Sequence, residues 1–189
     1  MEYSATVSLK DGRRCLLRSA GPEDAERALE QMVRVMGETD YLSRYPDEIT
    51  MTVEEEAGFL MGMAGDPRSL MLLAFVEEKH EDGLKDSLAG SALLYPVSPY
   101  ERQRHRAAFG VTILRVWWGL GIGTALLSAV IGAAREAGYQ QIELAVTASN
   151  GRAVALYKRF GFTVYGVRER AFLYRDGRYA DELLMSLRL

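Results

Sequence analysis

The spacing of apolar residues along the chain switches between alternation and a helical period, which predicts interspersed strands and helices. Residues 3–10 and 13–18 are predicted strands, because the pair Asp11-Gly12 between them favours a tight hairpin turn. A helix is predicted to follow Gly21-Pro22 and to end near Gly37, since proline suits a first helical turn and the apolar residues behind it share one face. The chain should therefore open with a hairpin and then a helix.

A second helix is predicted over residues 52–65, because Thr52 and Glu55 have the spacing of a capping box. Residues 70–77 and 88–97 are predicted strands. The charged segment that joins them is expected to be a loop without a catalytic role. Two helices are thus expected before the main sheet.

The C-terminal half predicts a strand–helix–strand crossover. Residues 104–116 are predicted to form a long strand, and residues 122–137 a helix that Gly138 ends. The short apolar run 142–146 should return as a strand parallel to the first. Asn150 is a favoured N-cap for the last helix.

Two last strands are predicted at residues 162–174 and 179–187, around the hairpin turn Asp176-Gly177. No internal repeat, low-complexity tract or linker interrupts the chain, so a single domain is expected over residues 1–189. Together these elements predict a mixed α+β fold, whose sheet is twisted and mostly antiparallel.

Composition and charge argue against several classes of protein. The chain of 189 residues contains 48% hydrophobic and 26% charged residues, which is ordinary for a soluble globular protein. Its formal net charge of -3 argues against a general nucleic-acid binder. No uninterrupted apolar stretch reaches the roughly 18 residues of a membrane span, so no membrane partner is expected.

Cysteine and histidine content bears on the redox compartment and on metal binding. Cys15 is the single cysteine, so an internal disulfide is excluded, and its apolar neighbours Leu16 and Leu17 indicate a buried residue rather than a nucleophile. With His80 and His105 as the two histidines and no cysteine pair, the spacing of a transition-metal site is missing. We expect a cytoplasmic protein that binds no metal.

The most informative local feature is the run Gly119-Leu120-Gly121-Ile122-Gly123, where a β-branched stretch gives way to a helix-forming one. Glycines let backbone N–H groups approach an anion closely, and the helix that begins there adds its partial positive charge. A Walker A loop is excluded because Thr124 and Ala125 follow, and a dinucleotide fingerprint is weak because its last glycine is missing. The alternatives that remain are a coenzyme whose pyrophosphate is bound by main chain alone, and a tight turn without a ligand.

A second motif bears on this choice. Residues 147–162 carry Asn150 at a helix start and Tyr157 two helical turns later, on the same face. This segment and the glycine run resemble, in the same order, the two hallmark motifs of the GNAT superfamily of acetyl-CoA-dependent N-acetyltransferases. The resemblance extends from about Asp11 to the C-terminus and implies the GNAT fold, in which two central parallel strands splay apart and admit the pantetheine arm. Trp118 stands where the family usually has Arg or Gln, which removes a side-chain contact but keeps the main-chain donors.

The resemblance also implies which residues bind acetyl-CoA, the acetyl donor. They are Ile113, Leu114 and Arg115 along the pantetheine arm, Leu120, Gly121, Ile122, Gly123 and Thr124 around the pyrophosphate, and Asn150, Ala153 and Tyr157 on the following helix. Arg102, Arg104 and Arg106 have two interpretations, as a solvated loop or strand face, or as a surface that attracts the 3′-phosphate of the coenzyme.

Three residues are candidates for the chemistry. The resemblance implies that Tyr157 donates a proton to the departing thiolate, and the alternative is an aromatic residue packed against the sheet. The glutamate base of some family members falls at Ala107, so His105, which lies on the same side of the strand, is the first candidate for a base or water relay. Glu38, in an acidic loop beside the expected acceptor pocket, is the second. The alternatives are a surface histidine and a polar surface loop.

The predicted reaction is direct attack of a bound amine on the thioester, without an acetyl-enzyme. The expected acceptor is a small amine or polyamine, ahead of a protein N-terminus or lysine and of an amine-bearing antibiotic or herbicide-like compound. A noncatalytic acyl-CoA-binding sensor and a fold without a ligand are the alternatives. Exposed edges of the terminal strands make a homodimer reasonable.

Overall fold

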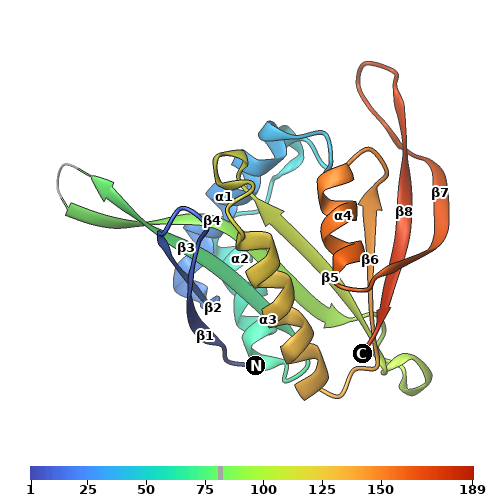
Figure 1. The fold of residues 1–189 in the computed structure, drawn as a ribbon, viewed down its shortest axis with the longest axis horizontal. Coiled ribbons are helices and arrows are strands. Elements are labelled where there is room, and N and C mark those ends of the chain that lie inside the picture. The colour runs from blue at the N-terminus through green and yellow to red at the C-terminus, as the bar shows by residue number, and fades with distance from the viewer. Residues whose placement is uncertain (81–82) are drawn as a thin grey trace.

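One eight-stranded sheet organises the molecule (Figure 1). The computed structural model describes residues 1–80 and 83–189. The strands are β1 (Ser4–Ser8), β2 (Arg14–Ser19), β3 (Leu70–His80), β4 (Gly83–Pro96), β5 (Arg106–Ile113), β6 (Gln141–Thr147), β7 (Thr163–Leu173) and β8 (Tyr179–Arg188), in the spatial order β1-β2-β3-β4-β5-β6-β8-β7. Neighbouring strands are antiparallel except β5 and β6, which confirms the predicted mixed α+β fold with a mostly antiparallel sheet.

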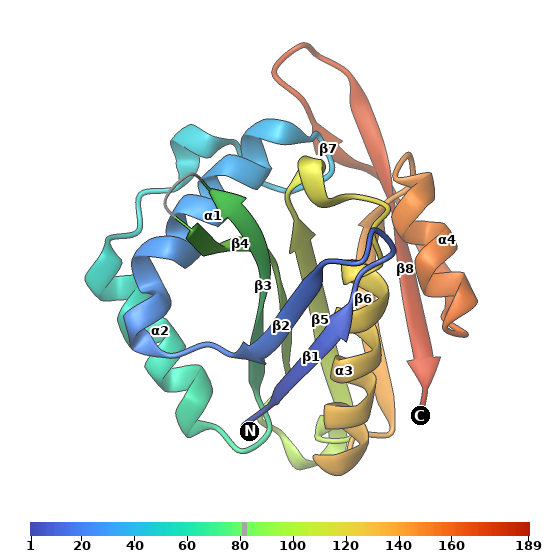
Figure 2. The same ribbon diagram turned by 60° about the vertical axis from the view of Figure 1, so that its left-hand side comes forward.

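Helices cover both faces of this sheet (Figures 1 and 2). They are α1 (Ala25–Glu38), α2 (Val53–Gly65), α3 (Ile122–Glu136) and α4 (Gly151–Arg159). The face that carries Leu73 and Phe75 of β3 packs against α2, and the opposite face, with Leu72 and Ala74, packs against α3. One strand supplies two cores because its side chains alternate between the faces. Among the described residues, no helix has the length and apolar character that crossing a membrane requires.

Local side-chain chemistry sets the helix starts that the sequence predicts. The hydroxyl of Thr52 accepts the N–H of Glu55 at 3.2 Å, and the Glu55 carboxylate accepts the N–H of Thr52 at 2.8 Å, which completes the capping box of α2. The side-chain oxygen of Asn150 accepts the N–H of Ala153 at 3.2 Å and caps α4. Gly121 is the N-cap of α3, with φ of 104°.

Strand boundaries differ from the prediction in two regions. β3 and β4 extend through most of residues 78–86, where we expected a loop, and Glu77 pairs in register with Asp86. Charged residues are compatible with a ribbon that projects from the body of the protein, so charge alone does not indicate a loop (Figure 1). Residues 81–82 and the side chain of His80 lie outside the described residues. The other strand, β5, ends at Ile113 rather than at residue 116, because the Leu114 carbonyl accepts the N–H of Trp117 at 2.9 Å and begins a 3₁₀ turn.

The parallel strands β5 and β6 separate part-way along the sheet. They pair from Arg106 opposite Gln141 to Ala108 opposite Glu143, and no further. Beyond that point β5 stays paired with β4, and β6 stays paired with β8. The two strands therefore diverge toward the glycine run, as the family resemblance predicts, and leave backbone edges that face each other across a gap (Figure 1).

Candidate active site

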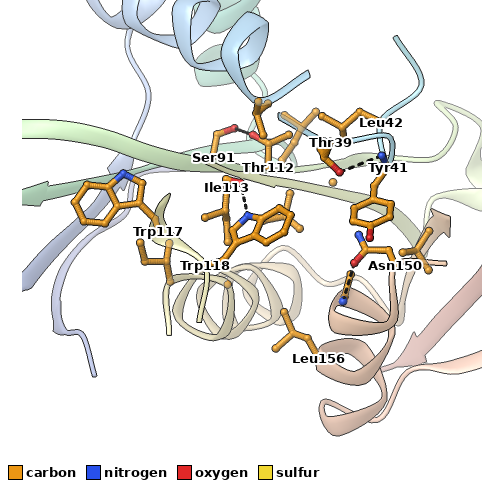
Figure 3. Close-up of a pocket in the computed structure, with 18 of the residues that line it drawn as sticks. Thr39, Tyr41, Leu42, Ser91, Thr112, Ile113, Trp117, Trp118, Asn150 and Leu156 are labelled. Carbon is orange, nitrogen blue, oxygen red and sulfur yellow. Dashed lines mark hydrogen bonds between the residues drawn. The ribbon is translucent and has the colours of Figure 1, made fainter. Parts of the chain in front are cut away.

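A cavity of about 790 Å³ is lined by both diverging strands and continues beneath α1 and α2. Its volume is in the range of pockets that bind small molecules. The glycine run and α4 line one part, which we call the turn side. Residues of α1, α2 and the loop between them line the other part, which we call the helix side (Figure 3).

The glycine run forms a turn with unpaired amides. Gly119 and Gly121 have φ of 85° and 104°, a left-handed conformation that glycine adopts without strain. The carbonyl of Leu120 accepts the N–H of Lys10 at 3.0 Å, which fixes the turn to the first hairpin. Within the described part of the chain, the N–H groups of residues 120–124 donate to no other backbone group. The start of a helix with free amides is a site for an anion, and a pyrophosphate would fit it.

Basic side chains surround this turn, although the sequence pointed to others. Lys10, Arg152 and Arg159 line the cavity, and Arg159 donates to the hydroxyl of Thr124 at 2.7 Å. By contrast, Arg106 begins β5 at the far end of that strand from the turn, where it forms an ion pair with Glu143. Arg102 and Arg104 lie in the exposed segment before it. The interpretation of these arginines as a solvated strand face agrees with the structure, whereas attraction of the 3′-phosphate does not.

Main-chain hydrogen bonds bear on the predicted pantetheine contacts of Leu114 and Arg115. The N–H of Leu114 already donates to the Ala89 carbonyl at 2.9 Å, and the N–H of Arg115 donates to the Glu38 carboxylate at 2.6 Å. Both amides are therefore engaged before any ligand arrives. Because backbone groups alternate in direction along a strand, the N–H groups of Val111 and Ile113 point toward β6 instead.

Trp118 covers the end of β5. Its indole N–H donates to the carbonyl of Ile113 at 2.7 Å, and its ring lies on the cavity wall across from Asn150 (Figure 3). The guanidinium carbons of Arg115 and Arg152 lie 5.8 and 5.3 Å from the ring centroid. Trp118 stands where the resembled motif usually has Arg or Gln. It occupies the carbonyl of Ile113, a main-chain acceptor, and supports Arg152 beside the turn.

The residues predicted on α4 lie on the cavity wall. Asn150, Ala153 and Tyr157 all line it. Tyr157 is 6% exposed, and its ring packs against Phe109 and Phe162 with centroid distances of 6.1 and 5.8 Å. Burial raises the pKa of its phenol to about 12. No described residue hydrogen-bonds the Tyr157 hydroxyl, so it is free to donate to a ligand in the cavity.

The structure does not bring the two predicted bases to the cavity. His105 precedes β5, and its carbonyl accepts the N–H of Gln140 at 2.9 Å. The first β5 residue on the cavity wall is Phe109, about 13 Å further along an extended chain. Glu38 is held by its hydrogen bond to Arg115 and by an ion pair with Arg34 at 3.1 Å. Its geometry is that of a brace between the end of α1 and the start of the glycine turn.

The sequence did not reveal four polar residues that line the cavity at its helix side. The amide of Gln31 donates to the hydroxyl of Thr112 at 3.1 Å, and that hydroxyl lies 2.9 Å from the hydroxyl of Ser91 (Figure 3). The fourth is Glu56, buried at 3% exposure. A signal for Glu56 existed, because it precedes buried Leu60 by one helical turn and so lies on the apolar face of α2.

The loop between α1 and α2 is fixed at several points. The hydroxyl of Thr147 donates to the carbonyl of Tyr41 at 3.1 Å, and the Tyr41 ring lies beside Asn150 (Figure 3). The hydroxyl of Tyr174, in the β7–β8 hairpin, donates to the Asp40 carbonyl at 2.7 Å. The hairpin therefore holds the loop over the helix side of the cavity.

Comparisons with known proteins agree with this geometry. Residues 29–162 match the sequence model of the acetyltransferase (GNAT) family. Over 95 residues the chain is 30% identical to the L-amino acid N-acetyltransferase AaaT of Escherichia coli strain K12, an alignment that spans 50% of this chain and 58% of that protein. The GNAT-family acetyltransferase of Streptococcus pneumoniae has a similar structure, with a TM-score of 0.82 and 31% identity, over 93% of this chain and 99% of that chain. The structure of yncA from Salmonella typhimurium with its cofactor acetyl-CoA shares the fold, with a TM-score of 0.76 and 20% identity over 92% of each chain.

Proposed function

The chain belongs to the acetyltransferase (GNAT) family, and on this premise we propose that it transfers the acetyl group of acetyl-CoA to a small primary amine, which attacks the thioester directly in a ternary complex. One observation carries the proposal. A continuous cavity joins the free amides of the glycine turn to a pocket beneath α1 and α2 that contains one acid. Donor and acceptor can therefore occupy the same cavity together.

The turn side of the cavity suits acetyl-CoA. The free amides of residues 120–124 can bind its pyrophosphate, and Lys10, Arg152 and Arg159 add positive charge around it. The backbone edge of Val111 and the N–H of Ile113 can pair with the amides of the pantetheine arm, as a neighbouring strand would, while the Ile113 carbonyl is occupied by Trp118. These contacts orient the thioester, which removes much of the entropic barrier to acyl transfer.

The environment of Cys15 supports direct attack. The residue is 0% exposed on β2, outside the cavity, and burial raises the pKa of its thiol to about 11. A thiol must ionise and reach the substrate before it can carry an acetyl group. Cys15 does neither, which supports direct attack by the amine over an acetyl-enzyme at this cysteine.

The charge of the pocket narrows the acceptor. Glu56 is the one acid among the described residues that line the cavity, and the apolar residues Met32, Phe59, Met71 and Leu93 surround the helix side. A polyamine carries several positive charges and would leave all but one without a counter-charge. A monoamine with an apolar body fits better than the polyamine that we also expected.

An amino acid is a specific candidate within this class. Arg44 is exposed and lines the helix side, where it can bind a carboxylate. The similarity to an L-amino acid N-acetyltransferase favours the same class of acceptor. An apolar amino acid would present its amine to Glu56 and its carboxylate to Arg44.

The test is a thiol-release assay with acetyl-CoA and a panel of L-methionine, L-phenylalanine, benzylamine, spermidine and a peptide with a free N-terminus. We expect free CoA and an acetylated product with a monoamine, at a kcat/KM at least tenfold above that for spermidine. Acetyl-CoA binding by calorimetry without thiol release from any amine would instead indicate a sensor.

Replacement of Glu38 by alanine separates a brace from a base. Loss of the carboxylate releases the segment at Arg115 that leads into the glycine turn, and ordering this segment again on binding would cost about 1 to 2 kcal/mol, so we expect the Kd for acetyl-CoA to rise roughly five- to thirtyfold. The shape of the pH–rate profile should not change, because Glu38 does not line the cavity. Turnover that is lowered at least 100-fold with unchanged acetyl-CoA affinity would identify Glu38 as a base.

A further inference from the structure

Glu56 is a buried carboxylate without a partner. Its side chain is 3% exposed, and the residue lines the helix side of the cavity. Within the described part of the chain, no group donates a hydrogen bond to its carboxylate, and no cation lies within ion-pair distance, 4.0 Å. Carboxylates are rarely buried in this way, because an unpaired buried charge is costly.

The carboxylate of Glu56 is not fully enclosed. No fully enclosed side-chain oxygen or nitrogen among the described residues lacks a hydrogen-bond partner. The carboxylate oxygens of Glu56 have no partner among these residues, so they retain some accessible surface. Because Glu56 also lines the cavity, a molecule bound there can approach its side chain.

The elements around α2 do not neutralise this charge. α1, β3 and the 3₁₀ segment Pro22–Asp24 pack against α2, and Asp24 is itself paired with Arg18 at 2.6 Å. Of the titratable groups on the loop between α1 and α2, Tyr41 and Arg44 line the cavity, and neither forms a bond with Glu56. Burial raises the pKa of the Glu56 carboxyl. The carboxylate thus lacks the counter-charge that a cationic ligand would supply.

We infer that Glu56 binds the ammonium group of the acceptor and removes its proton, so that the neutral amine can attack the thioester. The inference rests on the proposed function and names the base that the sequence did not reveal. Its geometric support is the position of an acid, unpaired among the described residues, in the pocket that the acceptor would occupy, a pocket that the hydrogen-bonded row Gln31, Thr112 and Ser91 also lines.

The carboxylate of Glu56 takes one proton from the ammonium, which leaves a carboxylic acid and a neutral amine. The amine nitrogen forms a bond to the carbonyl carbon, the carbon–sulfur bond breaks, and the thiolate leaves with the electron pair. The nitrogen then releases its second proton as the amide forms, and the thiolate takes up a proton as free CoA. Glu56 returns its own proton to solvent before the next turnover.

Burial of Glu56 brings its pKa closer to that of the ammonium from which it takes a proton. An ordinary glutamate ionises about six units below an alkyl ammonium, so proton transfer between them in water is very unfavourable. In an apolar pocket the carboxyl pKa rises and the ammonium pKa falls, because burial disfavours both charged forms. The difference between the pKa of the carboxyl and the pKa of the ammonium therefore becomes smaller.

The first experiment compares Glu56→Gln with Glu54→Gln. Both acids lie in the first turn of α2, but Glu54 is exposed and does not line the cavity. We expect Glu56→Gln to lower kcat/KM for benzylamine at least 100-fold at pH 7. The kcat/KM of Glu56→Gln should rise about tenfold per pH unit over the pH range in which most of the amine is protonated, because only the neutral amine reacts in this variant. Wild type and Glu54→Gln should show a much flatter profile. A Glu56→Gln profile parallel to wild type, or a loss below threefold, would overturn the inference.

Binding gives a second readout that does not depend on turnover. With CoA present, wild type should bind benzylamine at least tenfold more tightly than benzyl alcohol, which has the same shape but no charge. Glu56→Gln should lose this preference, and Glu54→Gln should keep it. Equal preferences in all three proteins would contradict a role for Glu56 in charge recognition. A wild type that binds benzylamine through Glu56 yet acetylates no amine would refute the proposed function alone.

Thermal stability excludes unfolding as the cause of lost activity. Because the folded pKa of Glu56 is raised, the ionised carboxylate destabilises the fold, and this cost appears as pH rises from the unfolded toward the folded pKa. Glu56→Gln removes a charge that lowers the free energy of unfolding at pH values above this range. Its Tm at pH 8 should therefore equal or exceed that of wild type, with a smaller difference at pH 4. A Tm well below that of Glu54→Gln at pH 8 would assign Glu56 a structural role instead.

Discussion

Replacement of Gly121 by alanine is expected to weaken acetyl-CoA binding about 100-fold. Gly121 has φ of 104° and is the N-cap of α3, where a side chain costs about 1 to 2 kcal/mol. If the turn relaxes to avoid this strain, its amides turn away from the pyrophosphate, and each lost charge-assisted hydrogen bond costs about 1.5 to 3 kcal/mol. Loss of one or two such bonds amounts to roughly 3 kcal/mol, or two orders of magnitude in Kd. Isothermal titration calorimetry with acetyl-CoA measures the change directly.

Gly132→Ala is the matched control in the same helix. Gly132 lies inside α3, and a Cβ at that position would meet no atom within 4 Å. Alanine favours a helix interior by about 1 kcal/mol, so this variant should be slightly more stable and should bind acetyl-CoA as wild type does. If Gly121→Ala bound the coenzyme within threefold of wild type, the glycine turn would not be the pyrophosphate site.

Tyr157→Phe is expected to lower kcat about 100-fold and to leave the Kd for acetyl-CoA within about threefold. The phenol pKa of about 12 lies roughly 3.5 units above that of a thiol, so complete proton transfer would cost about 5 kcal/mol. This is more than the roughly 2 kcal/mol that an ordinary tyrosine would require. Tyr157 should therefore act as a hydrogen-bond donor to the departing sulfur, and pre-steady-state kinetics with a good acceptor would measure the loss.

The pH dependence and a second tyrosine test this role. Since the phenol pKa is raised to about 12, the donor proton remains in place below that pH, and Tyr157 should add no basic limb to the kcat profile up to about pH 10. Tyr139→Phe is the control, because Tyr139 is also buried but lies outside the cavity and donates to the Arg68 carbonyl at 2.9 Å. That variant should lose about 1 kcal/mol of stability and no activity. Equal kcat in Tyr157→Phe and wild type would assign Tyr157 to packing against Phe109 and Phe162.

Much of the fold follows from short stretches of sequence. Thr52 and Glu55 predict the start of α2, and Asn150 predicts the start of α4, because capping involves residues within one helical turn of each other. Gly121 predicts the turn before α3, because the positive φ of that turn is a property of this one glycine. The extension of β3 and β4 into residues 78–86 was not predicted, because pairing between the two strands, rather than the polarity of their residues, decides where they end.

The candidate site was predictable only where a local sequence motif forms it. The glycine turn and α4 line the cavity as the motifs predict. Leu114 and Arg115 were expected to bind pantetheine, but their amides are engaged by Ala89 and Glu38, and no local pattern reveals such partners. His105 was a reasonable base on strand alternation, yet alternation fixes the side of the sheet and not the distance along it.

The sequence by itself thus determined the order of strands and helices, the glycine turn and the family, because each depends on residues that are neighbours in the chain. The tertiary structure alone decided which acid lines the cavity. Gln31 meets Thr112, and Glu56 lines the same cavity as both, only because α1 and α2 pack across the sheet next to β5. Burial without a counter-charge gives Glu56 its chemistry, and burial is a property of the packed fold rather than of any segment.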